Sequence, residues 1–221
     1  MSADHARNHG ARAFVHNGMD PRGYAQPDFE ARGGTFVFLA KAAWKVKNVR
    51  GAIRTARLAG APLEVLGGHR LNFKMGLRLT LDPNAHFHGM VGDAEKNRWL
   101  RGARGLLFPV RWPEPFGIAV IESLYFGVPV FGTPYGSLPE LVGAEAGALA
   151  TGAAELAEAA RAAERFDRRA VHAYWSERFT AQRMARKYLT YYEQILAGEQ
   201  LHPGPIESPP VRTNNLLPWF D

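Results

Sequence analysis

The chain has 221 residues, a formal net charge of +6 and no cysteine. This length suffices for one full-sized hydrophobic core, and the lack of cysteine excludes disulfides and thiol chemistry. No apolar run is long enough to cross a bilayer, and residues 1–13 lack the apolar segment of a signal peptide, so we expect a cytoplasmic protein with at most peripheral membrane contact. Lysines and arginines are scattered among acidic residues rather than massed, which argues against nucleic acid as a partner.

The N-terminal part of the chain contains a short apolar stretch but no alternation of strands and helices. Residues 13–16 predict a short strand, and Asn17-Gly18 predicts the turn that closes it, because both residues tolerate positive φ. Three histidines in this part are expected to be linker or surface residues: His5, His9 and His16.

From Gly33 the sequence alternates between strand and helix patterns. Apolar stretches predict strands at residues 35–40 and 62–66, and a helix is predicted between them at residues 48–58. This alternation predicts an α/β domain, a Rossmann-like parallel sheet flanked by helices. The loop after the first strand lies where open α/β sheets bind ligands, although read alone it also fits a flexible solvated segment. It carries three lysines, Lys41, Lys45 and Lys47.

Glycine and histidine pairs follow the second strand. Gly67-Gly68 does not belong to a G-x-G-x-x-G fingerprint that opens a helix, so a nicotinamide or flavin enzyme is not expected. Residues 85–91 predict a strand that places His86 and His88 on one face. Two histidines without an acidic residue or a third histidine beside them make a poor metal site, so we expect no metal.

The stretch from residue 106 to 140 carries the most informative combination of residues. An apolar strand leads into a loop with Glu114, and Gly117 opens a helix that is otherwise almost wholly apolar around Glu122. An unpaired buried carboxylate is costly, so Glu122 needs a cation, a backbone donor or a ligand hydroxyl. The first-turn N–H groups of this helix have no acceptors within the helix and favour an anion. The alternative is a core helix with a capping acid and a salt-bridged glutamate.

The rest of the sequence predicts a strand, helices and a tail. After a strand at residues 128–131, Ser137-Leu-Pro-Glu140 has the spacing of a helix capping box. Residues 198–221 are rich in proline and have no periodicity, so we expect a flexible tail or, at its apolar end, a docking peptide. Helices are expected at residues 151–164, 166–175 and 180–197, the last of them amphipathic.

The central stretch resembles a known enzyme family. Glu114-Pro-Phe-Gly leads to Glu122, and Gly-Val-Pro-Val and Gly-Ser-Leu-Pro-Glu follow at residues 127–130 and 136–140. These residues resemble the retaining family 4 glycosyltransferases of the GT-B fold, among the group 1 glycosyl transferases, whose signature is two glutamates separated by seven residues. Residues 15–24, Val-His-Asn-Gly-Met-Asp-Pro-Arg-Gly-Tyr, resemble the linker between the two domains of those enzymes.

The resemblance implies one half of a GT-B fold and a division of the chain. Residues 33–197 would form the donor-binding C-terminal domain, which is nucleotide-sugar-binding and Rossmann-like and ends in the amphipathic helix. Residues 1–32 would be the linker strand and turn from an N-terminal domain that is missing here, and residues 198–221 would be the tail.

The resemblance also assigns roles to the residues of the predicted site. Glu114 and the adjacent backbone amides would hold the donor sugar, and Glu122 would bind the ribose hydroxyls. Lys41 stands in place of the family's arginine and would neutralise the donor diphosphate together with Lys47, with Lys45 as the competing candidate. No metal or other cofactor is implied. The further donor-binding positions are Gly67, Gly68, Met90, Val91, Phe116, Gly117 and Ile118.

The implied function is transfer of a hexose from a nucleoside diphosphate sugar to a sugar or lipid-linked acceptor, with retention of configuration. The competing hypothesis is a non-catalytic nucleotide-sugar-binding module, either a gene remnant or one subunit of a split transferase. A sugar nucleotide epimerase of the same architecture is a weaker third option. An N-terminal domain subunit or self-association is expected to cover the apolar residues of the terminal helix, which are Tyr188, Tyr191 and Ile195.

Overall fold

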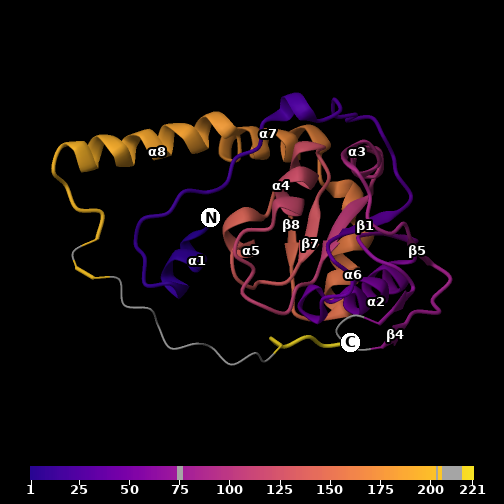
Figure 1. The fold of residues 1–221 in the computed structure, drawn as a ribbon. Helices are drawn as coiled ribbons and strands as arrows, with labels where there is room; N and C mark the ends of the chain where they lie inside the picture. Colours follow the sequence, from indigo (N-terminus) through magenta and orange to yellow (C-terminus); the bar gives the residue numbers. More distant parts are fainter. Residues whose placement is uncertain (74–76, 203, 206–215) are drawn as a thin grey trace.

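A parallel six-stranded sheet forms the centre of the protein in the computed structural model, which describes residues 1–73, 77–202, 204–205 and 216–221 (Figure 1). The strand order is β5-β2-β1-β6-β7-β8, and every neighbouring pair is parallel. Strands that are buried on both faces need continuous apolar runs, which is what these segments supply. The strands are β1 (Phe36–Leu39), β2 (Leu63–Leu66), β5 (Ala85–Phe87), β6 (Gly105–Phe108), β7 (Val130–Gly132) and β8 (Gly147–Leu149); a separate antiparallel pair is β3 (Leu71–Asn72) and β4 (Arg78–Leu79).

Helices cover both faces of the sheet. The chain runs from β1 outward to β2 and β5, then returns to β6 and continues outward to β8 on the other side. Because crossovers between parallel strands are right-handed, these two directions place their helices on opposite faces. Accordingly, α2 packs beside α6, and α4 packs beside α7. The helices are α1 (Ala3–Asn8), α2 (Val49–Ala59), α3 (Asp93–Arg101), α4 (Ile118–Tyr125), α5 (Leu138–Leu141), α6 (Ala153–Arg161), α7 (Arg168–Arg178) and α8 (Ala181–Leu196), with 3-10 turns η1 (Pro21–Gly23), η2 (Lys45–Lys47) and η3 (Ala163–Arg165).

The reversal of direction between β1 and β6 creates a topological switch point. β1 pairs directly with β6, so the loops that follow these two strands begin side by side at the carboxyl edge of the sheet. Open α/β sheets bind their ligands in the crevice at such a point. The two loops span residues 40–48 and 109–117, and they are the three-lysine loop and the Glu114 loop of the sequence analysis.

The α/β fold predicted from the sequence is confirmed, but the strand predicted at residues 13–16 is wrong. These residues pair with no strand in the described part of the chain. Instead, the adjoining Met19 forms an isolated bridge with Thr180, at the junction of α7 and α8. A short apolar stretch forms a strand only where the edge of a sheet lies within reach, and both edges of this sheet lie elsewhere.

The capping box predicted at Ser137 and Glu140 is also wrong. The Ser137 side chain makes no cap hydrogen bond to α5, and its Oγ donates to the carbonyl of Phe116 at 2.7 Å. The Glu140 carboxylate instead accepts the backbone N–H groups of Ala3 and Asp4, both at 2.8 Å. The carboxylate therefore caps α1, a helix distant in sequence, because tertiary contacts take precedence over the local spacing.

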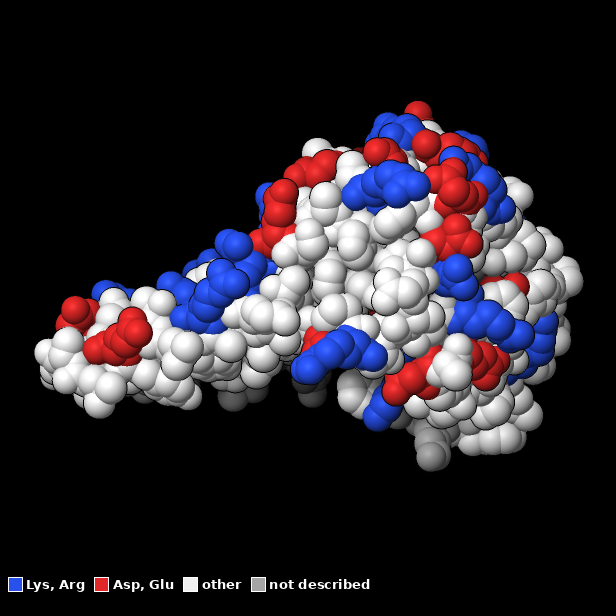
Figure 2. Space-filling view, turned by 90° about the horizontal axis from the view of Figure 1, so that it is seen from above, with Lys and Arg blue, Asp and Glu red and all other residues white. Residues whose placement is uncertain are grey.

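The C-terminal part of the chain contains an exposed helix and a final segment that packs against the domain. The helix α8 contains no buried residue and projects as an arm from the end of α7 (Figures 1 and 2). The last described residues return to the domain, where the Leu217 N–H donates to the Arg111 carbonyl and the Phe220 N–H donates to the Thr151 carbonyl. The apolar end of the expected flexible tail is thus docked, while residues 203 and 206–215 lie outside the described residues. None of the helices in the described ranges is long and apolar enough to cross a membrane.

Candidate functional site

An ion pair joins the two loops at the switch point. The Nζ of Lys47 lies 2.5 Å from Oε2 of Glu114, and the indole Nε1–H of Trp112 donates to the same oxygen at 2.8 Å. The Lys47 ammonium also lies 5.0 Å from the centre of the Trp112 ring. Only 13% of the Lys47 side chain and 8% of the Glu114 side chain are exposed. A pair this well shielded is screened weakly by solvent, and loss of either partner leaves a buried charge.

The other two lysines of the loop are placed differently. Lys41 is exposed, with its ammonium 5.0 Å from the centre of the Trp44 ring. Lys45 is exposed and lines a separate cavity of about 340 Å³ together with Trp44 and Arg111. Of the three lysines, the structure therefore brings Lys47 to Glu114, which makes it the better candidate for a ligand in this crevice.

Gly117 forms the start of α4 in the left-handed conformation, with φ 86° and ψ 73°. Glycine adopts this conformation without a steric penalty, and a Cβ at this position would lie 3.7 Å from Cγ of Glu114. No side chain caps the helix, and Ile118 in its first turn is exposed. The first-turn N–H groups are therefore available to an anionic ligand beside Glu114. The Phe116 side chain is buried, so of this residue only the backbone N–H can serve a ligand.

The second glutamate has a similar set of partners. Oε1 of Glu122 accepts the Tyr24 hydroxyl at 2.7 Å and the Lys96 ammonium at 2.7 Å, and Lys96 also bonds Asp93 at 2.8 Å. Burial and the hydrogen bond to Glu122 raise the pKa of Tyr24 to about 12. Burial disfavours the charge on Lys96, but the hydrogen bonds to Asp93 and Glu122 outweigh it and raise its pKa. Of the partners expected for Glu122, which were a cation, a backbone donor or a ligand hydroxyl, the structure supplies a cation, Lys96.

The glycine pair after β2 allows the backbone segments beside the site to approach each other closely. A Cβ on Gly67, which has φ 126°, would lie 2.2 Å from the Ala40 carbonyl oxygen, so glycine is needed for the close approach to the lysine loop. The N–H groups of Gly67 and Gly68 both donate to the Gly89 carbonyl. The strand end that follows presents an exposed Met90 side chain, whereas Val91 packs against the core. These glycines therefore hold three loops together at the same edge of the sheet.

The two histidines on β5 have an acidic neighbour that the sequence did not reveal. Glu64 on β2 is buried and accepts from His86 Nδ1 at 3.0 Å and from His88 Nε2 at 2.6 Å, through its two different oxygens. β2 and β5 are neighbours in the sheet, with Glu64 directly opposite His86. Over the described residues there is no group of three or more His, Cys, Asp or Glu side chains arranged to hold a metal ion.

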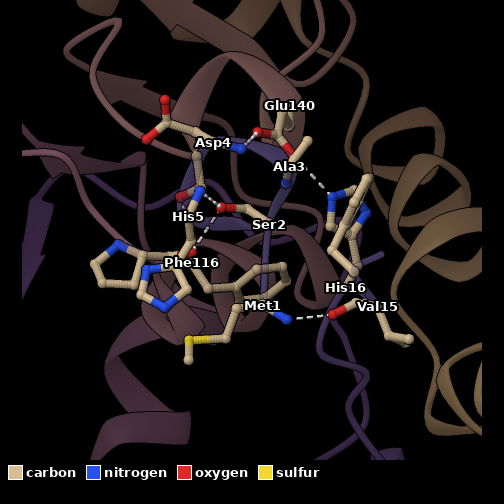
Figure 3. Close-up of polar contacts among 12 residues, drawn as sticks. Met1, Ser2, Ala3, Asp4, His5, Val15, His16, Phe116 and Glu140 are labelled. Carbon is tan, nitrogen blue, oxygen red and sulfur yellow. Dashed lines mark hydrogen bonds and ion pairs between the residues drawn. The ribbon is translucent and has the colours of Figure 1, made fainter. Parts of the chain in front are cut away.

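The N-terminal segment lies against the Glu114 loop (Figure 3). Ser2 is fully buried, and its Oγ donates to the carbonyl of Pro115 at 2.8 Å. His16 Nε2 lies 3.0 Å from the Glu140 carboxylate, and its ring packs against Phe116. Burial raises the pKa of the Glu140 carboxyl, but the hydrogen bonds from His16 and the backbone outweigh it and hold the pKa below its usual value. His16, expected to be a linker or surface residue, thus takes part in fixing this segment on the loop.

Three residues of the site were missed by sequence reasoning. Trp112 carried a detectable signal, since it is an aromatic donor close to Glu114 in the same loop. Tyr24 and Lys96 carried none, because they lie 98 and 26 residues from Glu122 in the chain. Their role becomes visible only when the fold brings residue 24 and α3 to α4.

The comparison with known families decides the identity of the chain. Residues 34–165 match the family described as glycosyl transferases group 1. The chain belongs to this family. The matched range includes Lys47, Glu114 and Glu122 but not Tyr24 or α8. No curated protein matches the chain in sequence.

Solved structures of glycosyltransferases share the fold. AviGT4, a glycosyltransferase involved in avilamycin A biosynthesis, is 21% identical with a TM-score of 0.69, and the match covers 83% of this chain and 58% of AviGT4. Sucrose-phosphate synthase from Thermosynechococcus elongatus is 17% identical with a TM-score of 0.66, covering 85% and 53%. Anabaena Alr3699/HepE in complex with UDP-glucose is 19% identical with a TM-score of 0.63, covering 83% and 57%. The chain spans little more than half the length of these proteins and has the architecture of one half of a GT-B fold.

Proposed function

We propose that the chain is the donor-binding half of a family 4 retaining glycosyltransferase, which transfers a hexose from a nucleoside diphosphate sugar to a sugar or lipid-linked acceptor. The observation that carries the proposal is the buried Lys47–Glu114 pair at the switch point, beside the uncapped first turn of α4. A cation and a helix start suit a diphosphate, and a buried carboxylate suits the hydroxyls of a sugar. The site therefore fits a ligand that combines both groups.

Lys47 is the principal counter-charge for the diphosphate in this proposal. As the bond from the anomeric carbon to the phosphate oxygen breaks, negative charge grows on the departing nucleoside diphosphate. The Lys47 ammonium has three N–H donors, of which one serves Glu114, so the others can bond phosphate oxygens. The exposed Lys41 ammonium provides further positive charge for the diphosphate. The first-turn N–H groups of α4, at the positive end of the helix dipole, do the same.

Glu122 takes the ribose hydroxyls of the donor. Glu122 is 5% exposed, and its carboxylate pairs with Lys96 of α3 at 2.7 Å. The base is placed along the strand end at Met90 and Val91, over the Gly67-Gly68 turn. The Alr3699/HepE structure contains UDP-glucose, which makes UDP-sugars the first donors to test.

Acceptor binding requires a second wall in this proposal, that is, a second protein surface that closes the cleft over the donor sugar. Transfer needs the acceptor to be held on the open face of the sugar in a cleft that excludes water. The match covers 58% of AviGT4 and 53% of sucrose-phosphate synthase, so a wall of this kind would be supplied by something other than residues 1–221. An N-terminal domain, or a second copy of the chain, would provide it. We therefore expect the isolated chain to bind donor and to hydrolyse it slowly at most.

A thermal-shift panel tests the donor proposal. UDP-glucose, GDP-mannose and ADP-glucose are each added to the purified chain, and a ligand present at a hundred times its dissociation constant stabilises the fold by about 2.7 kcal/mol. Lys47→Ala should remove the shift, while the exposed Lys45→Ala should retain it. If no nucleoside diphosphate sugar shifts the wild-type melting temperature, the proposed function is wrong.

Turnover is measured separately, with the best-binding donor, a broad acceptor panel and mass spectrometry. Robust multiple-turnover glycoside formation by the isolated chain would contradict the need for a second wall. Donor binding without transfer under any condition, including added N-terminal domains of relatives, would instead favour the non-catalytic binding module.

A further inference from the structure

The two glutamates of the site are held by the same arrangement of groups. Each receives two donors on a single carboxylate oxygen, one from a lysine and one from an uncharged aromatic side chain. For Glu114 these are Lys47 at 2.5 Å and Trp112 at 2.8 Å, both on Oε2. For Glu122 they are Lys96 at 2.7 Å and Tyr24 at 2.7 Å, both on Oε1.

In both clusters the lysine also lies against the ring of the aromatic donor. The Lys47 ammonium is 5.0 Å from the centre of the Trp112 ring, and the Lys96 ammonium is 5.3 Å from that of Tyr24. Each lysine, aromatic ring and glutamate thus forms a closed triad. The aromatic residue orients the carboxylate through its N–H or O–H and the lysine through its ring face.

This arrangement leaves one oxygen of each carboxylate for a ligand. No hydrogen bond reaches Oε1 of Glu114 or Oε2 of Glu122 from any residue that the structure describes. Both glutamates are largely buried, at 6% and 5% exposure, but their remaining oxygens are not among the described side-chain atoms that are fully shielded from solvent without a partner. A ligand hydroxyl can therefore reach the remaining oxygen and donate to it, provided that the carboxylate is held in the correct orientation.

We propose that Trp112 and Tyr24 are positioning residues, which aim the remaining oxygen of Glu114 at a hydroxyl of the donor sugar and that of Glu122 at the ribose. This inference rests on the proposed function. Lys47 cannot do this alone, because its remaining N–H groups serve the diphosphate, on which charge develops. The indole N–H and the tyrosine O–H carry no net charge and keep the carboxylates in place during that change.

The two halves of the donor separate the two roles experimentally. Calorimetry compares UDP-glucose with UDP on the full chain, so that the difference between the two affinities reports the sugar contacts alone. Trp112→Phe keeps a ring beside Lys47 and loses only the N–H, so it should weaken UDP-glucose roughly 10-fold and leave UDP unchanged. Tyr24→Phe keeps the ring beside Lys96 and should weaken both ligands by the same factor of roughly 10. If the panel selects another base, GDP-mannose and GDP replace this pair.

Matched variants control for the loss of an aromatic polar group. Trp175→Phe removes an indole N–H that is buried without a hydrogen-bond partner among the described residues, and Tyr174→Phe removes a hydroxyl on the same helix, α7. Both should retain the affinities for UDP and UDP-glucose. Trp112→His keeps a ring N–H and should retain most of the UDP-glucose affinity. This variant also tests the role of the N–H if Trp112→Phe does not fold.

The outcomes distinguish this inference from the proposed function. If wild type binds none of these ligands, the proposed function fails and the inference fails with it. If wild type binds but Trp112→Phe weakens UDP and UDP-glucose equally, or neither, Trp112 is not a positioning residue for the sugar. If Tyr24→Phe leaves UDP binding unchanged, the role of Tyr24 is wrong. An equal loss in Trp112→His and Trp112→Phe would show that ring size, rather than the N–H, matters.

Discussion

The two glutamate clusters use the same chemistry, but their partners come from different parts of the chain. Lys47 and Trp112 lie on the two loops at the switch point, inside the range that matches the glycosyltransferase family. Tyr24 lies outside that range and reaches Glu122 from the N-terminal segment, across 98 residues of sequence. The Glu114 cluster is therefore built by loops of the sheet alone, whereas the Glu122 cluster also requires the N-terminal segment to be docked.

Because their partners differ in origin, the two clusters depend differently on local unfolding. The Glu114 cluster lies on the loops that directly follow two neighbouring strands of the core, β1 and β6. The Tyr24 ring is held by edge contacts with Tyr125 and Phe126, while Met19 bridges to Thr180. Because these contacts hold a segment that lies outside the sheet, they can be lost without unfolding the sheet. The Glu122 cluster thus depends on the docking of the N-terminal segment.

The largest expected effect is on the Glu114 cluster, from Lys47→Ala. The substitution leaves Glu114 buried without its cation, and breaking a buried pair in this way costs about 3 kcal/mol of unfolding free energy. Urea denaturation measures the loss. Lys45→Ala serves as the control, because Lys45 is exposed on the same loop and should change the stability little. Equal stabilities for both variants would show that the Lys47–Glu114 pair is not formed in solution.

Replacement of the glutamates compares the two clusters directly by ligand binding. Glu122→Ala should lower the affinity for UDP and for UDP-glucose alike, by roughly 10-fold, since it removes an acceptor for the ribose. Glu114→Ala should lower the affinity for UDP-glucose more than that for UDP. Calorimetry on both variants gives the two ratios. Should Glu122→Ala bind UDP as well as wild type does, the ribose assignment is wrong.

Gly117→Ala tests the helix start that lies between the two clusters. The left-handed backbone at Gly117 disfavours any Cβ and the change should cost about 1–2 kcal/mol of unfolding free energy. Gly60→Ala is the matched control, because Gly60 has φ 76° and open space around its Cβ position. Both variants should lose similar stability, but only Gly117→Ala should weaken binding of UDP. Equal UDP affinities would place the diphosphate away from the start of α4.

The sequence predicted the sheet because its local patterns agree with the global fold. The buried strands are continuous apolar runs, and Asn48 and Thr180 cap α2 and α8 as their positions indicate. The strand expected at residues 13–16 failed, because a strand depends on a neighbour that local pattern does not specify. Glu140 failed for a related reason: its spacing from Ser137 predicts a local cap, yet its carboxylate caps α1 instead.

The candidate site was predictable where its residues lie in one motif and not where the fold assembles it. Glu114 and Glu122 were proposed from the composite motif that contains them, and Lys47 from its place after a strand. The choice of Lys47 over Lys45 needed coordinates, since η2 turns the two side chains in different directions. Tyr24 was out of reach, because a hydroxyl on a linker residue carries no periodicity that points to α4.

The smallest effect expected, and the sharpest difference between the clusters, appears at high pH. The pKa of Tyr24 is raised to about 12 by burial and by its hydrogen bond to Glu122, compared with about 10 in an unfolded chain. Because the folded state holds the proton more tightly, the stabilisation by Tyr24 is fully present below about pH 10 and is lost as the pH rises toward about 12. Trp112 does not titrate in this range, so the Glu114 cluster keeps its aromatic donor.

The measurement is the difference in unfolding free energy between wild type and Tyr24→Phe, from urea denaturation at several pH values. This difference should be constant up to about pH 9 and should shrink above about pH 10, because the tyrosine that distinguishes the two proteins loses its proton more readily when unfolded. The other tyrosines titrate in both proteins and cancel. The matching difference between wild type and Trp112→Phe should stay constant over the same range, since the indole N–H does not ionise. If the difference in unfolding free energy between wild type and Tyr24→Phe also stays constant to the highest pH, the Tyr24 hydroxyl is not bound to Glu122. The two clusters would then not share the same arrangement of lysine, aromatic donor and glutamate.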